Sequence, residues 1–283
     1  MYVWSKLSSA RWNDAWEERF AGHPDLSLAL TSVPGRDTVR VELYSAKKAP
    51  LLAVQKQFGG RLRELKQRNW AALTTPAMPP LKVRDRLVVC AARTPAEIAR
   101  AAKAHPGREI IAIPADMAFG TGHHATTATV LRLLTDAAEP LAGTRWSFAD
   151  LGAGTGILAI AAAKLGAAKV WGCDFDPKAV EVARDNLARN GTPEVRMVVA
   201  DVLEWKSKLA YDIVAANIFH DILEAAFPQI IAAVKPGGAL MVSGILKSQA
   251  DGCLAVAARL GIDWQRVVTR GKWVSAIGRR PAQ

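Results

Sequence analysis

The sequence lacks any apolar run near the roughly 18 residues that a membrane-spanning helix needs. The best candidate, residues 157–163, ends at Lys164. Residues 1–6 also lack the basic start and apolar middle of a secretory signal, and no small-residue cleavage site follows. We therefore expect a cytoplasmic protein without a membrane segment.

Cysteine is scarce as well. Cys90, Cys173 and Cys253 are odd in number, far apart in the chain and never in a Cys-x-x-Cys pair. This pattern argues against a disulfide framework and against a cysteine metal site. We expect these three side chains in the core.

Histidine gives no metal signal either. His123 and His124 are adjacent, but no acidic or cysteine cluster stands beside them at ligand spacing. A general-base role is open to His124 or His220, because imidazole titrates near neutral pH. We favour a hydrogen bond within a loop and expect no bound metal.

Acidic residues are too few to balance the basic ones, and the formal net charge is +11. Such a charge suggests a partner that is acidic or that sits beside nucleic acid. A soluble protein that is merely basic is the alternative. The densest basic cluster, residues 59–70, could equally be a solvated face of a strand and a helix end.

The length of 283 residues suits a main domain of about 200 residues with a smaller one attached. Residues 1–66 show strand and helix patterns in the order βαββαβ, which predicts a small ferredoxin-like α+β domain. Trp12, Trp16 and Phe20 recur every four residues, so we expect them on one buried helix face. Residues 67–85 are rich in proline and unpatterned, and we assign them to a linker.

Residues 86–283 alternate between strand and helix patterns, with Pro236-Gly237-Gly238 expected to end the last of the alternating helices. This alternation predicts a doubly wound α/β sheet, mostly parallel and covered by helices on both faces. The tail, residues 262–277, is expected to close the sheet as an antiparallel hairpin. The central strands are expected at residues 146–151, 169–174, 195–200, 212–217 and 239–243.

A glycine-rich turn follows the first of these strands, where residues 150–157 are Asp-Leu-Gly-Ala-Gly-Thr-Gly-Ile. Glycine lets the backbone turn tightly and approach a ligand closely. The dinucleotide fingerprint Gly-x-Gly-x-x-Gly would put its last glycine at Ile157, so the spacing differs. Asp174 ends the next strand, where its carboxylate can accept both hydroxyls of a ribose. Together these features predict an adenosine ligand, and a structural turn is the alternative.

This glycine motif resembles the first motif of the class I methyltransferases, which use S-adenosylmethionine. Asp201 resembles their acidic position beside adenine, with a helix N-cap as its alternative role. Asn217 ends the fourth strand, at the edge where open α/β sheets bind ligands, and its amide can orient an incoming amine. Enzymes that methylate exocyclic or glutamine nitrogens often have Asn-Pro-Pro-aromatic here. The sequence Asn-Ile-Phe-His at residues 217–220 argues against that branch.

Three separated motifs are similar to those of the PrmA family, the ribosomal protein L11 lysine methyltransferases. They are Phe-Gly-Thr-Gly-x-His-x-Thr-Thr at 119–127, Ala-Asn-Ile at 216–218 and Ser-Gly-Ile-Leu at 243–246. In that family the threonine-rich loop folds over the cofactor and the N-terminal domain recognises the ribosomal protein. The resemblance covers roughly residues 67–270. It implies that Asn217 is catalytic and that the cofactor contacts are Phe119, Thr121, Thr127, Gly152, Gly154, Asp174, Asp201 and Asn217.

Four positions depart from the family pattern. The family usually has threonine and proline at His123 and Ala125, and small residues at Phe219 and His220. The resemblance implies transfer of methyl groups to lysine amines of ribosomal protein L11, with N-terminal amines left open and transient contact with ribosomal RNA. Because the departures border the transfer site, another protein lysine or a small molecule remains an alternative acceptor. A non-catalytic module that holds the cofactor or RNA is the other alternative.

Overall fold

The computed structural model describes residues 2–20, 23, 25–32, 37–64, 79–114 and 122–282. The chain divides into two compact units, residues 1–74 and 75–283. Among the described residues, no helix is long and apolar enough to cross a membrane.

The first unit has the expected element order, and its sheet has the strand order β2-β3-β1-β4 with every pair antiparallel. This is the arrangement of a ferredoxin-like α+β domain. The unit has a core of its own around Trp4, Leu43 and Leu51. Its elements are β1 (Tyr2–Ser9), η1 (Ala10–Trp12), α1 (Asn13–Phe20), β2 (Ser27–Ser32), β3 (Thr38–Ser45), α2 (Lys48–Phe58) and β4 (Arg61–Glu64).

Of the three aromatic residues expected on one buried helix face, Trp12 is exposed, so the prediction for Trp12 is wrong. The rings of Trp16 and Phe20 stack at 6.2 Å and pack on the core. Trp12 is 51% exposed and lies in the 3-10 turn η1. A 3-10 helix has three residues per turn rather than 3.6, so Trp12 leaves the face that Trp16 and Phe20 share.

The second unit begins with a three-stranded sheet in the order β5-β6-β7. Its elements are β5 (Leu81–Val83), β6 (Leu87–Cys90), α3 (Pro95–Ala104) and β7 (Glu109–Ala112). The sequence placed residues 67–85 in a linker, and most of that range lies outside the described residues. Its last part is a strand instead, because residues 81–83 pair with β6 and bury Val83 completely. The Asn190 amide bonds both backbone groups of Ala112, at 2.7 and 2.9 Å, and so ties β7 to the rest of the unit.

A seven-stranded sheet forms the centre of the second unit, in the order β10-β9-β8-β11-β12-β14-β13. The strands from β10 to β12 are parallel, and β14 and β13 add the expected antiparallel hairpin. The strands are β8 (Ser147–Leu151), β9 (Lys169–Asp174), β10 (Arg196–Val199), β11 (Tyr211–Asn217), β12 (Val234–Leu246), β13 (Asp263–Arg270) and β14 (Trp273–Arg279).

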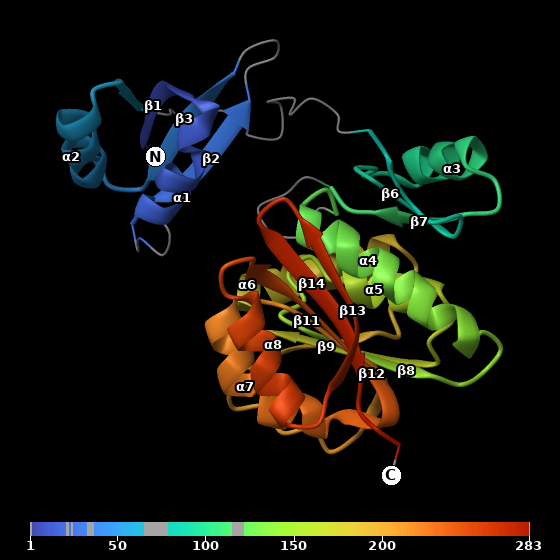
Figure 1. The fold of residues 1–283 in the computed structure, drawn as a ribbon. Coiled ribbons are helices and arrows are strands. Elements are labelled where there is room, and N and C mark those ends of the chain that lie inside the picture. The colour runs from blue at the N-terminus through green and yellow to red at the C-terminus, as the bar shows by residue number, and fades with distance from the viewer. Residues whose placement is uncertain are drawn as a thin grey trace. The chain divides into compact units, whose positions relative to one another are not determined.

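Helices cover both faces of this sheet, as predicted (Figure 1). Because side chains alternate along a strand, Phe148 of β8 joins the core under α4, α5 and α6, and Ala149 joins the core under α7 and α8. The doubly wound α/β fold is therefore confirmed. The helices are α4 (Ala125–Ala138), η3 (Glu139–Leu141), α5 (Ile157–Lys164), α6 (Pro177–Arg189), α7 (His220–Ala232) and α8 (Ala250–Arg259).

The sequence prediction placed the end of helix α7 wrongly. Helix α7 ends at Ala232, and Pro236-Gly237-Gly238 lies inside β12 rather than at the helix terminus. The N–H of Gly237 donates to the carbonyl oxygen of Arg280 at 2.8 Å, so this segment is paired at the beginning of the strand. Proline is tolerated at a strand's beginning, where the ladder does not need its missing N–H.

Candidate active site

A cavity of about 510 Å³ opens at the carboxyl ends of β8, β9 and β11. The chain runs outward from β8 through β9 and β10, then returns to β11 on the other side of β8. Open α/β sheets bind ligands in the crevice at such a reversal. The structure brings together most of the predicted residues there, since the cavity is lined by Gly152, Gly154, Asp174, Asp201 and Asn217.

The glycine turn between β8 and α5 forms one wall of this cavity. Gly152 has φ +70° and Gly154 has φ +53°, backbone conformations that favour glycine. A Cβ at Gly152 would lie 2.2 Å from Cγ2 of Ile218. The Ile218 side chain already fills the space beside Gly152, so a side chain at Gly152 would have to displace it.

The carboxylate of Asp174 is held from two sides at the end of β9. The Gly154 N–H donates to Oδ2 at 2.8 Å, and the Asp176 N–H donates to Oδ1 at 3.1 Å. A carboxylate offers about four lone-pair sites, so both oxygens can accept further bonds from a ligand. Asp174 is thus a fixed pair of acceptors at the cavity wall, suited to two neighbouring hydroxyls.

Asp150, which sequence reasoning did not assign to the site, is a second carboxylate behind the glycine turn. Its Oδ2 accepts from the N–H of Ala159 at 3.0 Å, whereas its buried Oδ1 has no partner among the described residues. Burial, with a smaller contribution from the charge of Asp174, raises the pKa of Asp150 to about 7. The only sequence signal for it was its place as the first residue of the glycine motif.

The side chain of Asn217 lies at the end of β11 with one half of its amide engaged. Nδ2 donates to Oγ1 of Thr127 at 3.5 Å. Oδ1 is buried and has no hydrogen-bond partner among the described residues. A buried unpaired acceptor is unfavourable unless a ligand supplies a donor. The site is therefore ready to accept a hydrogen bond from an N–H group.

Thr127 does not itself line the cavity. It is 1% exposed in the first turn of α4, and its link to the site is the contact with Asn217. The cavity is lined instead by two neighbours in the same turn, His124 and Thr126.

His124 is the N-cap of α4 and forms a local hydrogen bond with Thr126, at 2.6 Å between Nδ1 and Oγ1. Its ring also meets the ring of Trp273 edge to face at 5.2 Å. Burial lowers the pKa of His124, so the ring is neutral at neutral pH. His123 bonds the carbonyl oxygen of Pro79 at 2.9 Å. In the part of the chain that the structure describes, no cluster of metal-ligating side chains occurs.

Asp201 follows β10 at the cavity rim. Its Oδ1 accepts from the N–H of Leu203 at 2.9 Å, in a turn and not at a helix N-terminus. The remaining predicted contacts, Phe119 and Thr121, lie outside the described residues, and their cofactor contacts stay predictions.

Three aromatic side chains complete the lining. Phe175 and Phe219 are 76% and 69% exposed, and Trp273 enters from the start of β14. Such exposed flat apolar faces at a cavity suit a flat ring or a hydrocarbon chain. Phe175 and Trp273 were missed, although the position of Phe175 directly after Asp174 is a usable signal.

The fold has a counterpart among solved structures. A ribosomal protein L11 methylase from Lactobacillus delbrueckii subsp. bulgaricus matches it with a TM-score of 0.60 and 26% sequence identity, over 71% of this chain and 98% of that one. With this sheet order, the glycine turn, the acidic acceptor at the end of β9 and the asparagine at the end of β11, the protein is a class I methyltransferase.

The family follows from the sequence comparisons. Residues 27–281 match the family described as ribosomal protein L11 methyltransferase (PrmA), a longer match than the resemblance at 67–270. A ribosomal protein L11 methyltransferase of Dechloromonas aromatica is 38% identical over 76% of this chain and 67% of that protein. One of Aliivibrio salmonicida is 35% identical over 83% of this chain and 74% of that protein. The chain belongs to this family, and S-adenosylmethionine is its methyl donor.

Proposed function

We propose that this enzyme transfers methyl groups from S-adenosylmethionine to amino groups of ribosomal protein L11, lysine side chains first among them. The observation that carries the proposal is the buried Oδ1 of Asn217, which has no partner among the described residues and belongs to a side chain at the wall of a cavity of about 510 Å³. An amine is the complementary donor. The names of the relatives support L11 as the protein that carries this amine.

The described residues fit the donor molecule. Asp174 would accept the ribose hydroxyls with oxygens that already have fixed orientations, and Asp201 would lie on the adenine side. Gly152 and Gly154 line the cavity without side chains, which lets a ligand approach the backbone of the glycine turn closely. When bound, S-adenosylmethionine supplies a methyl group on a sulfonium that leaves as a neutral thioether, so no acid is required.

The chain must then present a neutral amine. A free lysine has a pKa near 10.4, so roughly one amine in a few thousand is neutral at pH 7. Removal from water beside Ile218, Phe219 and Ile222, which line the cavity, would lower that pKa. Asn217 would accept an N–H of the neutral amine and hold its lone pair in one direction. Positioning is then the main catalytic contribution.

The first unit is proposed to select the acceptor protein. Support comes from its separate hydrophobic core and from its independent compactness. A chain beginning at residue 75 is expected to keep cofactor binding and to lose methylation of L11. Full activity of that truncated chain would contradict this role.

A substrate that belongs to the ribosome also supports a cytoplasmic reaction and transient contact with ribosomal RNA.

Intact-protein mass spectrometry of L11 tests the proposal directly. The purified acceptor is incubated with the enzyme and S-adenosylmethionine, and mass gains in steps of one methyl group are expected. Calorimetry confirms cofactor binding in the same preparation. Cofactor binding without a mass gain would refute L11 as the acceptor. It would favour another protein lysine, a small molecule or a non-catalytic binder.

A further inference from the structure

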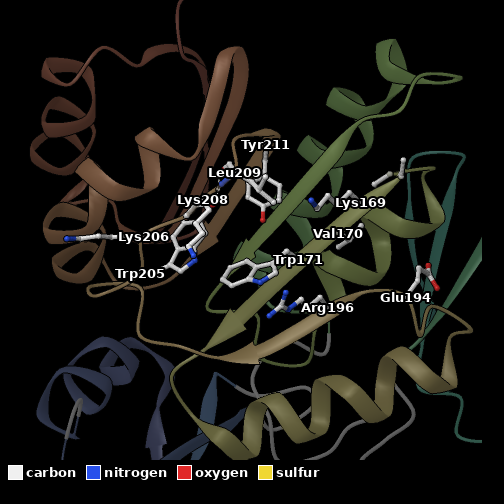
Figure 2. A pocket seen from close by; sticks show the side chains of 13 residues that line it. Lys169, Val170, Trp171, Glu194, Arg196, Trp205, Lys206, Lys208, Leu209 and Tyr211 are labelled. Atoms are coloured by element: carbon white, nitrogen blue, oxygen red, sulfur yellow. Dashed lines mark hydrogen bonds between the residues drawn. The ribbon is translucent and has the colours of Figure 1, made fainter.

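A second cavity, of about 540 Å³, opens at the amino ends of the central strands of the seven-stranded sheet. Figure 2 shows the side chains that line it. Its lining includes Lys169, Arg196 and Tyr211, which begin β9, β10 and β11. The proposed methyl-transfer site lies at the other ends of these same strands. The second cavity is therefore separate from the chemistry.

This cavity exists because one crossover of the sheet has no helix. Helices α5, α6 and α7 connect the other parallel strands, but residues 200–210 join β10 to β11 through turns alone. Trp171 and Arg196 are paired in register across β9 and β10, so their side chains share a face of the sheet. Helices α7 and α8 pack on the same face of the sheet, but over β11 and β12 and not over the beginnings of β9 and β10.

Two stacked tryptophans form an aromatic wall in this cavity. The rings of Trp171 and Trp205 stack at 5.0 Å with an interplanar angle of 14°. Both are partly buried and pack against the neighbouring core. Figure 2 shows Trp171, Trp205 and Tyr211 around the same hollow. A flat ring can stack on such a surface with little loss of side-chain entropy.

Positive charge surrounds this aromatic wall. The lining contains Lys169, Arg196, Lys206 and Lys208 but one carboxylate, Glu194. None of these five side chains forms an ion pair with another described residue. Burial raises the pKa of Tyr211, and both Ser207 and Arg196 oppose that rise. The cations are thus available to an anionic ligand from solution.

We propose that this second cavity binds single-stranded RNA, with a base stacked on the tryptophan wall and phosphates on Arg196, Lys208 and Lys169. Stacking platforms combined with basic grooves are how proteins hold single strands without reading their sequence. An acidic peptide would use the cations but not the flat rings. This assignment rests on the RNA contact proposed above and gives that contact a site. It does not depend on which protein is methylated.

Binding of a short fluorescently labelled single-stranded RNA, followed by anisotropy, tests the assignment. Arg196→Ala/Lys208→Ala is expected to weaken binding about tenfold and to flatten the log Kd against log salt plot by about 1.4, since each phosphate contact contributes about 0.7 for single strands. The control Lys103→Ala/Arg259→Ala removes two exposed charges elsewhere and should bind like the wild type. Equal losses in both double variants would overturn the proposal.

The aromatic contribution is tested with Trp205→Ala, expected to weaken binding about tenfold, and Trp205→Phe, expected to retain most of it. A wild type that binds no RNA, or that binds a nucleoside monophosphate as tightly as the oligonucleotide, would contradict an RNA site. Methylation of isolated L11 is measured on the same variants and should not change. Variants that lose RNA binding but keep methylation would support this site, whereas a wild type that methylates L11 but binds no RNA would refute the site and leave the proposed reaction standing.

Discussion

The amide of Asn217 donates to the hydroxyl of Thr127 across 3.5 Å, joining the end of β11 to the first turn of α4. Thr127 is buried and outside the cavity lining, so under the proposed mechanism its effect on the reaction passes through Asn217. In this orientation Nδ2 faces Thr127, and Oδ1 has no hydrogen-bond partner among the described residues.

Thr127→Val should therefore slow methyl transfer while cofactor affinity stays nearly constant. Valine keeps the shape but removes the acceptor, and a net hydrogen bond contribution of about 1 kcal/mol corresponds to roughly fivefold in rate. Thr127→Ser keeps the hydroxyl and should retain most of the rate. Single-turnover assays with equal rates for threonine and valine would show that this contact does not orient the amide.

Asp174→Asn should weaken binding of S-adenosylmethionine by about 10- to 100-fold, because hydrogen bonds to a charged acceptor contribute about 1.5–3 kcal/mol. Calorimetry measures this directly. Asp185→Asn removes the same charge from the exposed side of α6 and serves as the matched control. Identical affinities for the two variants would exclude Asp174 as the ribose acceptor.

Two glycines with positive φ, Gly166 after α5 and Gly152 in the glycine turn, separate the cost of backbone strain from the cost of a steric collision. Gly166 has φ +97° and no atom within 4 Å of an added Cβ, whereas a Cβ at Gly152 would meet Ile218 at 2.2 Å. Gly166→Ala should cost about 1–2 kcal/mol of stability from its backbone alone. Gly152→Ala should cost about 3 kcal/mol or more, because overpacking is added. Denaturant titrations giving the same loss for both would refute the close approach.

Asp150 should make the enzyme less stable as pH rises. Its pKa is about 7 in the folded chain and near 3.8 when unfolded, so the folded state binds more protons between those values. The free energy of unfolding should then fall by about 4 kcal/mol between about pH 4 and pH 7 and level off above the folded pKa. Asp150→Asn removes this proton linkage. Urea titrations across this range would contradict the account if wild type and variant had parallel profiles.

The alternating part of the fold was predictable because parallel strands and their helices repeat one local pattern. Strand β9 was predicted with the bounds that the structure gives, at residues 169–174. Sequence reasoning failed where local geometry departs from that repeat. Trp12 leaves its expected face through a 3-10 turn, and Pro236 enters a strand whose neighbours accommodate it.

The site was predictable to the extent that it depends on strand ends. Gly152 follows β8, and Asp174 and Asn217 end the neighbouring strands β9 and β11. The carboxyl ends of these strands therefore bring the three residues together. Thr127 and Trp273 could not be placed this way, because their relation to the site depends on how α4 and β14 pack. The second cavity was also unforeseen, since Trp171 and Trp205 meet only through the irregular connection after β10.

The single-turnover rate of methyl transfer by Asn217→Ala, measured beside its affinity for S-adenosylmethionine, tests the central claim most directly. If Oδ1 of Asn217 positions the acceptor amine, the rate on L11 should fall by about 100-fold. The dissociation constant of the cofactor should change by no more than about threefold, so the loss lies in the transfer step. An unchanged rate, or a loss explained entirely by weaker cofactor binding, would contradict the account.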